Sequence, residues 1–177
     1  MRKDIIKSFV IMSGIVLLGL AQSVYASGTI SGQIRFEPRS GETGAAEWTR
    51  IYIVRHEVPF PKNDIEHPLV IHNRQDRINL AYQKFYSNFQ REAAKGNFLA
   101  ATTLAATDGS FRFTDIDKGR YFIVVAFPSA IGGYKVTWQL EVSVTDNAIS
   151  SVELNRENLL LPTFSRKNGG HIIEAGI

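Results

Sequence analysis

Histidines and carboxylates are the residues of this chain best suited to acid–base or metal chemistry near neutral pH. His67 and His72 stand five residues apart, close to Asp64 and Glu66. A carboxylate that orients a histidine can produce a general base, so a hydrolase site here, with Ser87 or water as nucleophile, is one hypothesis. The histidine spacing matches no standard zinc pattern. The chain also lacks a Gly-x-Ser-x-Gly elbow, a His-Glu-x-x-His motif, a phosphate-binding loop and cysteine. We therefore expect no catalytic residue, no metal site and no cofactor, and we predict that the protein is not an enzyme.

Three aspartates form a second group with possible metal chemistry. Asp108, Asp115 and Asp117 lie within ten residues and offer the oxygen ligands that calcium prefers. Each also stands next to a predicted turn, where aspartate commonly bonds the backbone. Turn formation is the favoured interpretation.

Aromatic side chains are the remaining candidates for binding. Trp48, Tyr52, Tyr82 and Tyr86 are predicted ligand-binding residues, because exposed aromatic rings stack on sugars and anchor protein partners. The alternative is that these rings pack in the core and bind nothing.

The first 26 residues predict an export signal. Three basic residues precede an uncharged apolar stretch over 9–20, and Val24 and Ala26 occupy the positions that a signal peptidase reads. A membrane anchor is the alternative, but the stretch is shorter than a bilayer requires. Removal of residues 1–26 leaves 17 Lys and Arg against 16 Asp and Glu. A net charge so close to zero gives little electrostatic attraction for nucleic acid. After cleavage of residues 1–26 we expect no membrane span.

The elements that position these residues are mainly strands. Apolar and polar residues alternate along most of the chain, with Gly, Asp and Asn turns between the runs, which is typical of a β-sandwich of about seven strands. Residues 121–127 are apolar on both faces, as in an interior strand covered on both sides. Gly32, on the inner face of the first strand, predicts close approach by a backbone or a large side chain. The predicted strands cover residues 29–36, 48–55, 98–106, 110–114, 121–127, 134–145 and 148–154.

Residues 57–96 interrupt this run of strands. After an irregular first part, Ile78, Tyr82, Phe85 and Phe89 follow a helical spacing, which predicts an amphipathic helix of about 19 residues. Its expected N-cap is Asp76 or Asn73. The stripe could cover the outer face of the sheet or form an aromatic ligand platform, and covering is the more common use.

Several short motifs carry a resemblance to a known family. The Thr-Asp-Gly-Ser-Phe-Arg-Phe motif over 107–113 and the Ile-Asp-Lys-Gly-Arg-Tyr motif over 116–121 resemble the carboxypeptidase regulatory-like, or transthyretin-like, domain. That family is related to starch-binding-like sandwiches. The resemblance implies a non-catalytic prealbumin-like, immunoglobulin-like sandwich over 27–155, here with a helical insertion at 57–96 and a C-terminal tail at 156–177.

Two functional hypotheses follow. The first is an exported binding or accessory module that recognises a glycan or a protein in the periplasm or at the cell surface. The second is a structural role in which an edge strand pairs with another chain. Residues 98–106 carry no charged side chain, so this strand has little to discourage pairing if it lies at an edge. The alternative is an interior strand whose two sides are already paired.

Overall fold

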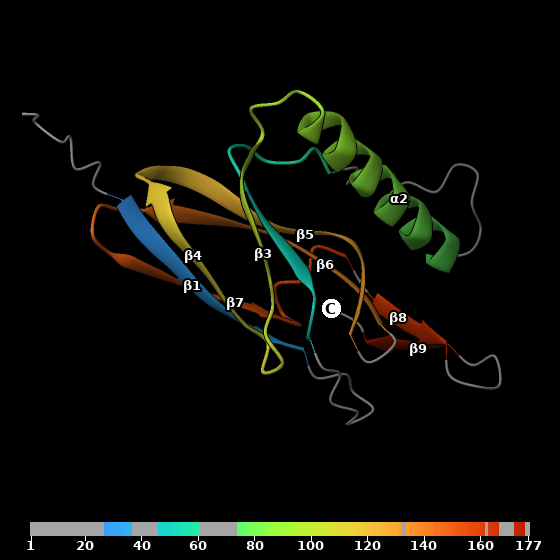
Figure 1. Cartoon of the computed structure of the whole chain (residues 1–177). Coiled ribbons are helices and arrows are strands. Elements are labelled where there is room, and N and C mark those ends of the chain that lie inside the picture. The colour runs from blue at the N-terminus through green and yellow to red at the C-terminus, as the bar shows by residue number, and fades with distance from the viewer. Residues whose placement is uncertain are drawn as a thin grey trace, which may run out of the picture.

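The computed structural model describes residues 27–36, 46–60, 74–131, 134–161, 163–166 and 172–175. Seven strands form two facing sheets, and one helix covers the outside of the larger sheet (Figure 1). The fold class expected from the sequence is confirmed. The elements are β1 (Ser27–Arg35), β2 (Arg50–Val54), α2 (Arg74–Ala93), β3 (Leu99–Leu104), β4 (Ser110–Asp117), β5 (Gly119–Ile131), β6 (Tyr134–Val144), β7 (Ile149–Asn155), β8 (Thr163–Arg166) and β9 (Ile172–Ala175).

The smaller sheet has the order β4-β1-β7 and the larger has the order β3-β2-β5-β6. The neighbours β1 and β7 are parallel, and the other neighbouring strands of the two sheets are antiparallel. Strands β8 and β9 form a separate antiparallel pair. Because β5 lies between β2 and β6, the prediction that residues 121–127 belong to an interior strand is confirmed.

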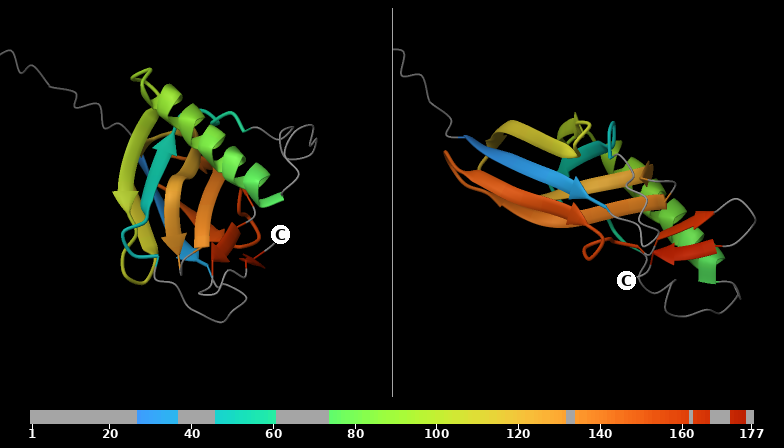
Figure 2. Two further views of the ribbon diagram at one scale, coloured as in Figure 1. Left: turned by 90° about the vertical axis from the view of Figure 1, so that its right-hand side faces the viewer. Right: turned by 90° about the horizontal axis from the view of Figure 1, so that it is seen from below.

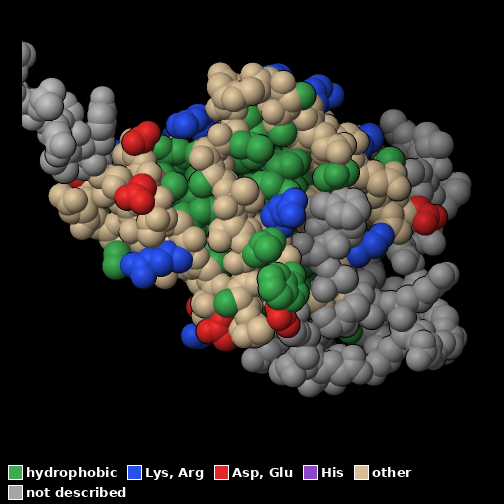
Figure 3. Space-filling view, viewed as in Figure 1, with side chains coloured by type: hydrophobic (Ala, Val, Ile, Leu, Met, Phe, Trp, Pro, Cys, Tyr) green, Lys and Arg blue, Asp and Glu red, His purple; other side chains and the backbone are tan. Residues whose placement is uncertain are grey.

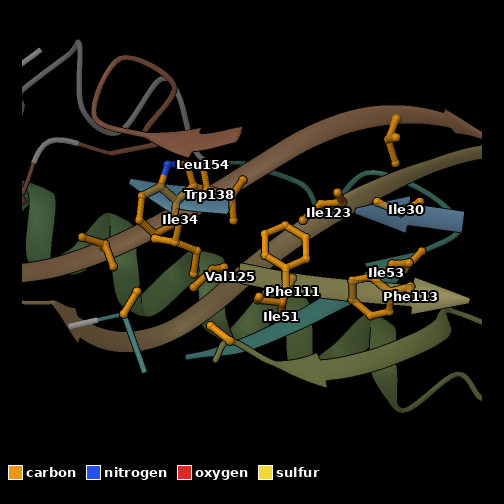
Figure 4. Packing of buried hydrophobic residues seen from close by; sticks show 14 of the residues in the cluster. Ile30, Ile34, Ile51, Ile53, Phe111, Phe113, Ile123, Val125, Trp138 and Leu154 are labelled. Atoms are coloured by element: carbon orange, nitrogen blue, oxygen red, sulfur yellow. The ribbon is translucent and has the colours of Figure 1, made fainter. Parts of the chain in front are cut away.

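The main core fills the space between the sheets (Figure 4). Trp138 is fully buried there, and its indole Nε1 donates a hydrogen bond to the Asn155 carbonyl oxygen at 2.8 Å. The ring of Phe111 lies over Gly32, where a Cβ atom would come within 2.0 Å of the ring. The close approach predicted at Gly32 is therefore confirmed.

A second apolar cluster lies on the outer face of the larger sheet. Phe85 and Phe89 of α2 pack there with Val54, Val124 and Phe98. Figure 2, left, shows the helix lying across this sheet. The prediction that the helical stripe covers the sheet is confirmed. Helix α2 begins at Arg74, between the two expected N-cap positions in the sequence.

Several strands differ from their predicted form: β4 and β5 extend beyond the predicted 110–114 and 121–127, and β3 is shorter than the predicted 98–106. The expected strand over 48–55 is shorter, because Trp48 belongs to a turn and β2 begins at Arg50. The sequence of β6 alternates apolar even-numbered and polar odd-numbered residues, which predicts that the odd-numbered side chains face outward, yet Thr137 is 1% exposed. Its hydroxyl donates to the Val125 carbonyl, and the Gln139 amide exchanges hydrogen bonds with the backbone of Val58. The outward row of β6 is thus partly covered rather than solvated.

The described helix is not a membrane span. In the part of the chain that the structure describes, no helix combines the length and apolarity needed to cross a bilayer.

Candidate functional site

Trp48 is the most exposed large apolar residue in the described part of the chain. The residue is 71% exposed, and it lies in the turn that leads into β2. Its backbone has φ of 63°, in the left-handed region that residues other than glycine seldom adopt. The turn is held by hydrogen bonds from the Trp48 N–H to the Ala105 carbonyl and from the Thr49 N–H to the Ala46 carbonyl, both 3.1 Å.

Tyr52 takes part in helix docking. It lies on the outer face of β2, half-buried, with its ring centroid 4.8 Å from that of Phe89 of α2. Only a part of the ring is therefore available to a ligand.

The other two predicted tyrosines lie on α2 and are also half-buried. The Tyr82 hydroxyl donates to the Lys135 carbonyl of β6 at 3.1 Å, which ties the helix to the sheet. The Tyr86 hydroxyl accepts a hydrogen bond from the Gln90 side chain at 2.9 Å within the helix. Of the four predicted residues, Trp48 alone is mostly exposed.

A small polar cluster fastens the C-terminal end of α2 to the end of β2. The Glu92 carboxylate is nearly buried and lies 2.6 Å from the Lys95 ammonium and 3.1 Å from the His56 ring. These hydrogen bonds, the one from Lys95 first, lower the pKa of the Glu92 carboxyl below its usual range. The cluster is a helix-to-strand link, since a carboxylate with two partners in this position holds the two elements together.

The three aspartates weighed as calcium ligands occupy a turn, a bulge and the last position of β4. The Asp108 carboxylate accepts a hydrogen bond from the Ser110 N–H at 2.8 Å, and bonding to Ser110 lowers the pKa of that carboxyl. Asp115 has φ of 58° and lies where β4 has one more residue than β1. Among the described residues no three His, Cys, Asp or Glu side chains are grouped as metal ligands. His67, His72, Asp64 and Glu66 lie outside the described residues, and Ser87 is exposed on α2.

Strand β3 is the outer strand of the larger sheet, so the alternative of an interior strand is wrong. Its backbone pairs with β2 on one side, and no described strand pairs with its other side. Figures 1 and 3 look onto this edge, and Figure 3 shows hydrophobic side chains gathered over the middle of it. Leu99 and Leu104, at the two ends of β3, are each 42% exposed.

The other sheet edges are protected in ways that β3 is not. Strand β4 carries Arg112, Asp115 and Asp117, and charged side chains on an edge strand discourage strand pairing. At the edge of β6, the Leu160 N–H donates to the Thr137 carbonyl at 2.9 Å. Strand β7 carries Glu153. Strand β3 has the sequence Leu-Ala-Ala-Thr-Thr-Leu and no charge.

We define the β3 edge site as Trp48, Leu99, Thr102, Thr103 and Leu104. The sequence indicated the lack of charge and offered Trp48 as a binding residue, but it placed Trp48 in a strand and not in a turn, because no Gly, Pro or Asn marks that turn. Which side of β3 is unpaired depends on contacts between segments far apart in the chain.

Comparisons with known proteins give weak structural likenesses. No protein-family model and no curated protein sequence matches the chain. The chain is similar to the minor pilin GBS52 of Streptococcus agalactiae, with a TM-score of 0.42 and 12% identity over 74% of this chain and 44% of the pilin. It is also similar to a Pseudomonas aeruginosa protein with a proposed carbohydrate-binding role, with a TM-score of 0.37 and 13% identity over 74% of this chain and 89% of that one.

Proposed function

We propose that this protein is an exported, non-catalytic assembly module that takes an extended strand of a protein chain onto the free side of β3. The observation that carries the proposal is an uncharged edge strand with no described strand on its other side, in a sandwich whose other edges carry charges or a covering segment. A free edge of this kind presents unpaired N–H and C=O groups as a template for another strand.

The backbone of β3 supplies a defined set of hydrogen-bonding groups. The Ala105 N–H donates to the Thr49 carbonyl, so the Ala105 backbone faces β2. Since alternate residues of an antiparallel strand face the same neighbour, Thr103 and Ala101 also face β2, while Thr102 and Leu104 face the free side. A bulge at the beginning of β3 leaves Ala101–Leu104 as its regular part.

Trp48 gives the edge an aromatic anchor. Its turn lies beside the end of β3, and interface hot spots are enriched in tryptophan. The exposed indole also supports a second candidate function, in which Trp48 stacks on a sugar ring. A glycan array would distinguish glycan binding from strand pairing. If the protein binds glycans through Trp48, the parent protein gives an array signal and Trp48→Ala loses it. If it pairs strands only, neither the parent protein nor Trp48→Ala gives a signal.

The proposal also includes the family and the location. We assign the sandwich to the carboxypeptidase regulatory-like class on its sequence motifs, and export to the periplasm or cell surface on the pattern of residues 1–26, which lie outside the described residues. Mass spectrometry of the protein from fractionated cells should find a chain that begins at Ser27. An uncleaved chain retained in the cytoplasm would contradict export.

Photocrosslinking tests the β3 edge directly. A benzophenone amino acid replaces Leu104 on β3 or, as the control, Ser151, an exposed strand residue of the other sheet, and the cells are irradiated. We expect a discrete crosslinked protein band from position 104 and none from position 151. Introducing Thr102→Lys should reduce the band, because a charge on an edge strand opposes pairing. Equal crosslinking from both positions, or none from position 104, would show that β3 is not the binding surface.

A further inference from the structure

We infer that the strand taken onto β3 is the β3 strand of a second copy of this chain, antiparallel to the first about a twofold axis at Thr103. This inference rests on the proposed function and names its partner. The result is one continuous sheet, in which the two copies of β3 lie side by side at the centre and β2, β5 and β6 follow outward on each side.

The register follows from the direction of the backbone groups. Because Thr102 and Leu104 face the free side, the N–H and C=O groups of Thr102 pair with those of Leu104 of the second copy. By the twofold symmetry, Leu104 of the first copy pairs with Thr102 of the second in the same way. These two pairs supply about four hydrogen bonds. Thr103 then lies opposite its own copy in a non-hydrogen-bonded pair. This register uses only the regular part of β3 and avoids the bulge.

The side chains of β3 are compatible with this self-pairing. Thr103 and Ala101 lie opposite Ile51 and Ile53 of β2 and therefore share the inner face of the sheet. On the outer face, Leu104 of one copy lies beside Thr102 of the other, so an apolar side chain meets a β-branched one, a combination that packs well in sheets. Threonine pairs across strands are also favourable.

Charge does not oppose the arrangement. In β2, the charged residue opposite the regular part of β3 is Arg50, which lies opposite Leu104, one strand away from the interface. The two copies of Arg50 are separated by three strand spacings, roughly 14 Å, and charges that far apart are largely screened at physiological ionic strength. The 17 basic and 16 acidic residues outside 1–26 add little net repulsion.

A cysteine placed on the proposed axis tests the register. The chain has no cysteine, so any disulfide must come from the introduced residue. Directly opposite residues in a non-hydrogen-bonded pair have Cβ atoms roughly 5 Å apart, close enough for a disulfide after a small adjustment. On mild oxidation Thr103→Cys should form a covalent dimer at least about tenfold faster than Ala101→Cys, because Ala101 lies opposite Ala105 and not its own copy. Ala101→Cys is a matched control, since it lies on the same strand and the same face.

A charge-swap experiment tests the pairing without cysteine. In the dimer, the double variant Thr102→Lys, Leu104→Lys would place two pairs of lysines directly opposite each other, and like charges there oppose pairing. Light scattering at high concentration should therefore show a monomer for this variant and a dimer for the unmodified mature chain. Mixing it with the variant Thr102→Glu, Leu104→Glu should restore a dimer that contains one of each, since opposite charges across strands attract. Circular dichroism checks that each variant is folded, and Ser151→Lys controls for added charge elsewhere.

The outcomes separate this inference from the proposed function. An unmodified chain that stays monomeric at high concentration, with equal disulfide formation in Thr103→Cys and Ala101→Cys, overturns the self-pairing. If photocrosslinking at position 104 then captures a different protein, strand pairing at β3 stands with another partner. If it captures nothing, the proposed function fails as well.

Discussion

At the scale of single residues, the sandwich depends on contacts that tolerate little change in size. Gly32 lies under the ring of Phe111, so a larger residue there would displace the ring. Trp48 presents the opposite case, because its indole is mostly exposed while its backbone occupies an unfavourable conformation. An exposed aromatic side chain held at a strained position is more consistent with binding than with stability.

Substitution of Trp48 by glycine should separate these two roles. We expect Trp48→Gly to raise the free energy of unfolding by roughly 0.5–1 kcal/mol, because relief of the left-handed conformation is partly offset by the greater freedom of glycine in the unfolded chain. Urea denaturation measures this change. Trp48→Ala keeps the positive φ and serves as the control, with no expected gain. A loss of stability in Trp48→Gly would mean that the indole supports the fold.

At the scale of elements, the attachment of α2 has an apolar and a polar part. Phe85 and Phe89 bury the apolar stripe, and Glu92 links the end of the helix to His56 and Lys95. The aromatic residues of the helix thus serve mainly to fix it on the sheet.

The link through Glu92 should make stability depend on pH. The pKa of Glu92 is lowered in the folded state, so its contribution is fully present above the pKa of the unfolded chain and is lost as the pH falls through the folded value. We therefore expect Glu92→Gln to be less stable than the parent protein at neutral pH, with a difference that shrinks in acid. Denaturation over a pH series measures it, and Glu153→Gln, an exposed carboxylate on β7, is the control. A difference independent of pH would contradict the ionic role.

At the scale of the whole molecule, the two apolar clusters lie on opposite faces of the same strands. Ile53 and Val54 are neighbours in β2, and one belongs to the core between the sheets while the other belongs to the cluster under α2. Strand β5 is shared in the same way through Val125 and Val124. The helix and the sandwich should therefore unfold as one cooperative unit.

Truncation of the helix anchor tests this cooperativity. Phe85 is fully buried, so Phe85→Ala should lower the free energy of unfolding by about 3–5 kcal/mol. Far-UV circular dichroism and the fluorescence of the buried Trp138 should report the same transition. Gln83→Ala, an exposed position on the same helix, should change stability little. Two separate transitions would show that α2 unfolds on its own.

The sequence by itself determined the seven strands of the two sheets, the helix and the inner face of most of these strands, but not the pair β8–β9 in the expected tail. These follow from local alternation and helical spacing, which reflect the burial of side chains a few residues apart. The lack of charge in β3 was also visible, because it is a property of one short segment.

Only the tertiary structure decided which edges are free and which aromatic residues are exposed. The edge position of β3, the contact of Tyr52 with Phe89 and the cover over Thr137 all join segments distant in the chain. The alternation of a strand is the same at the edge of a sheet and in its middle, since it records which faces are buried and not which neighbours supply the hydrogen bonds.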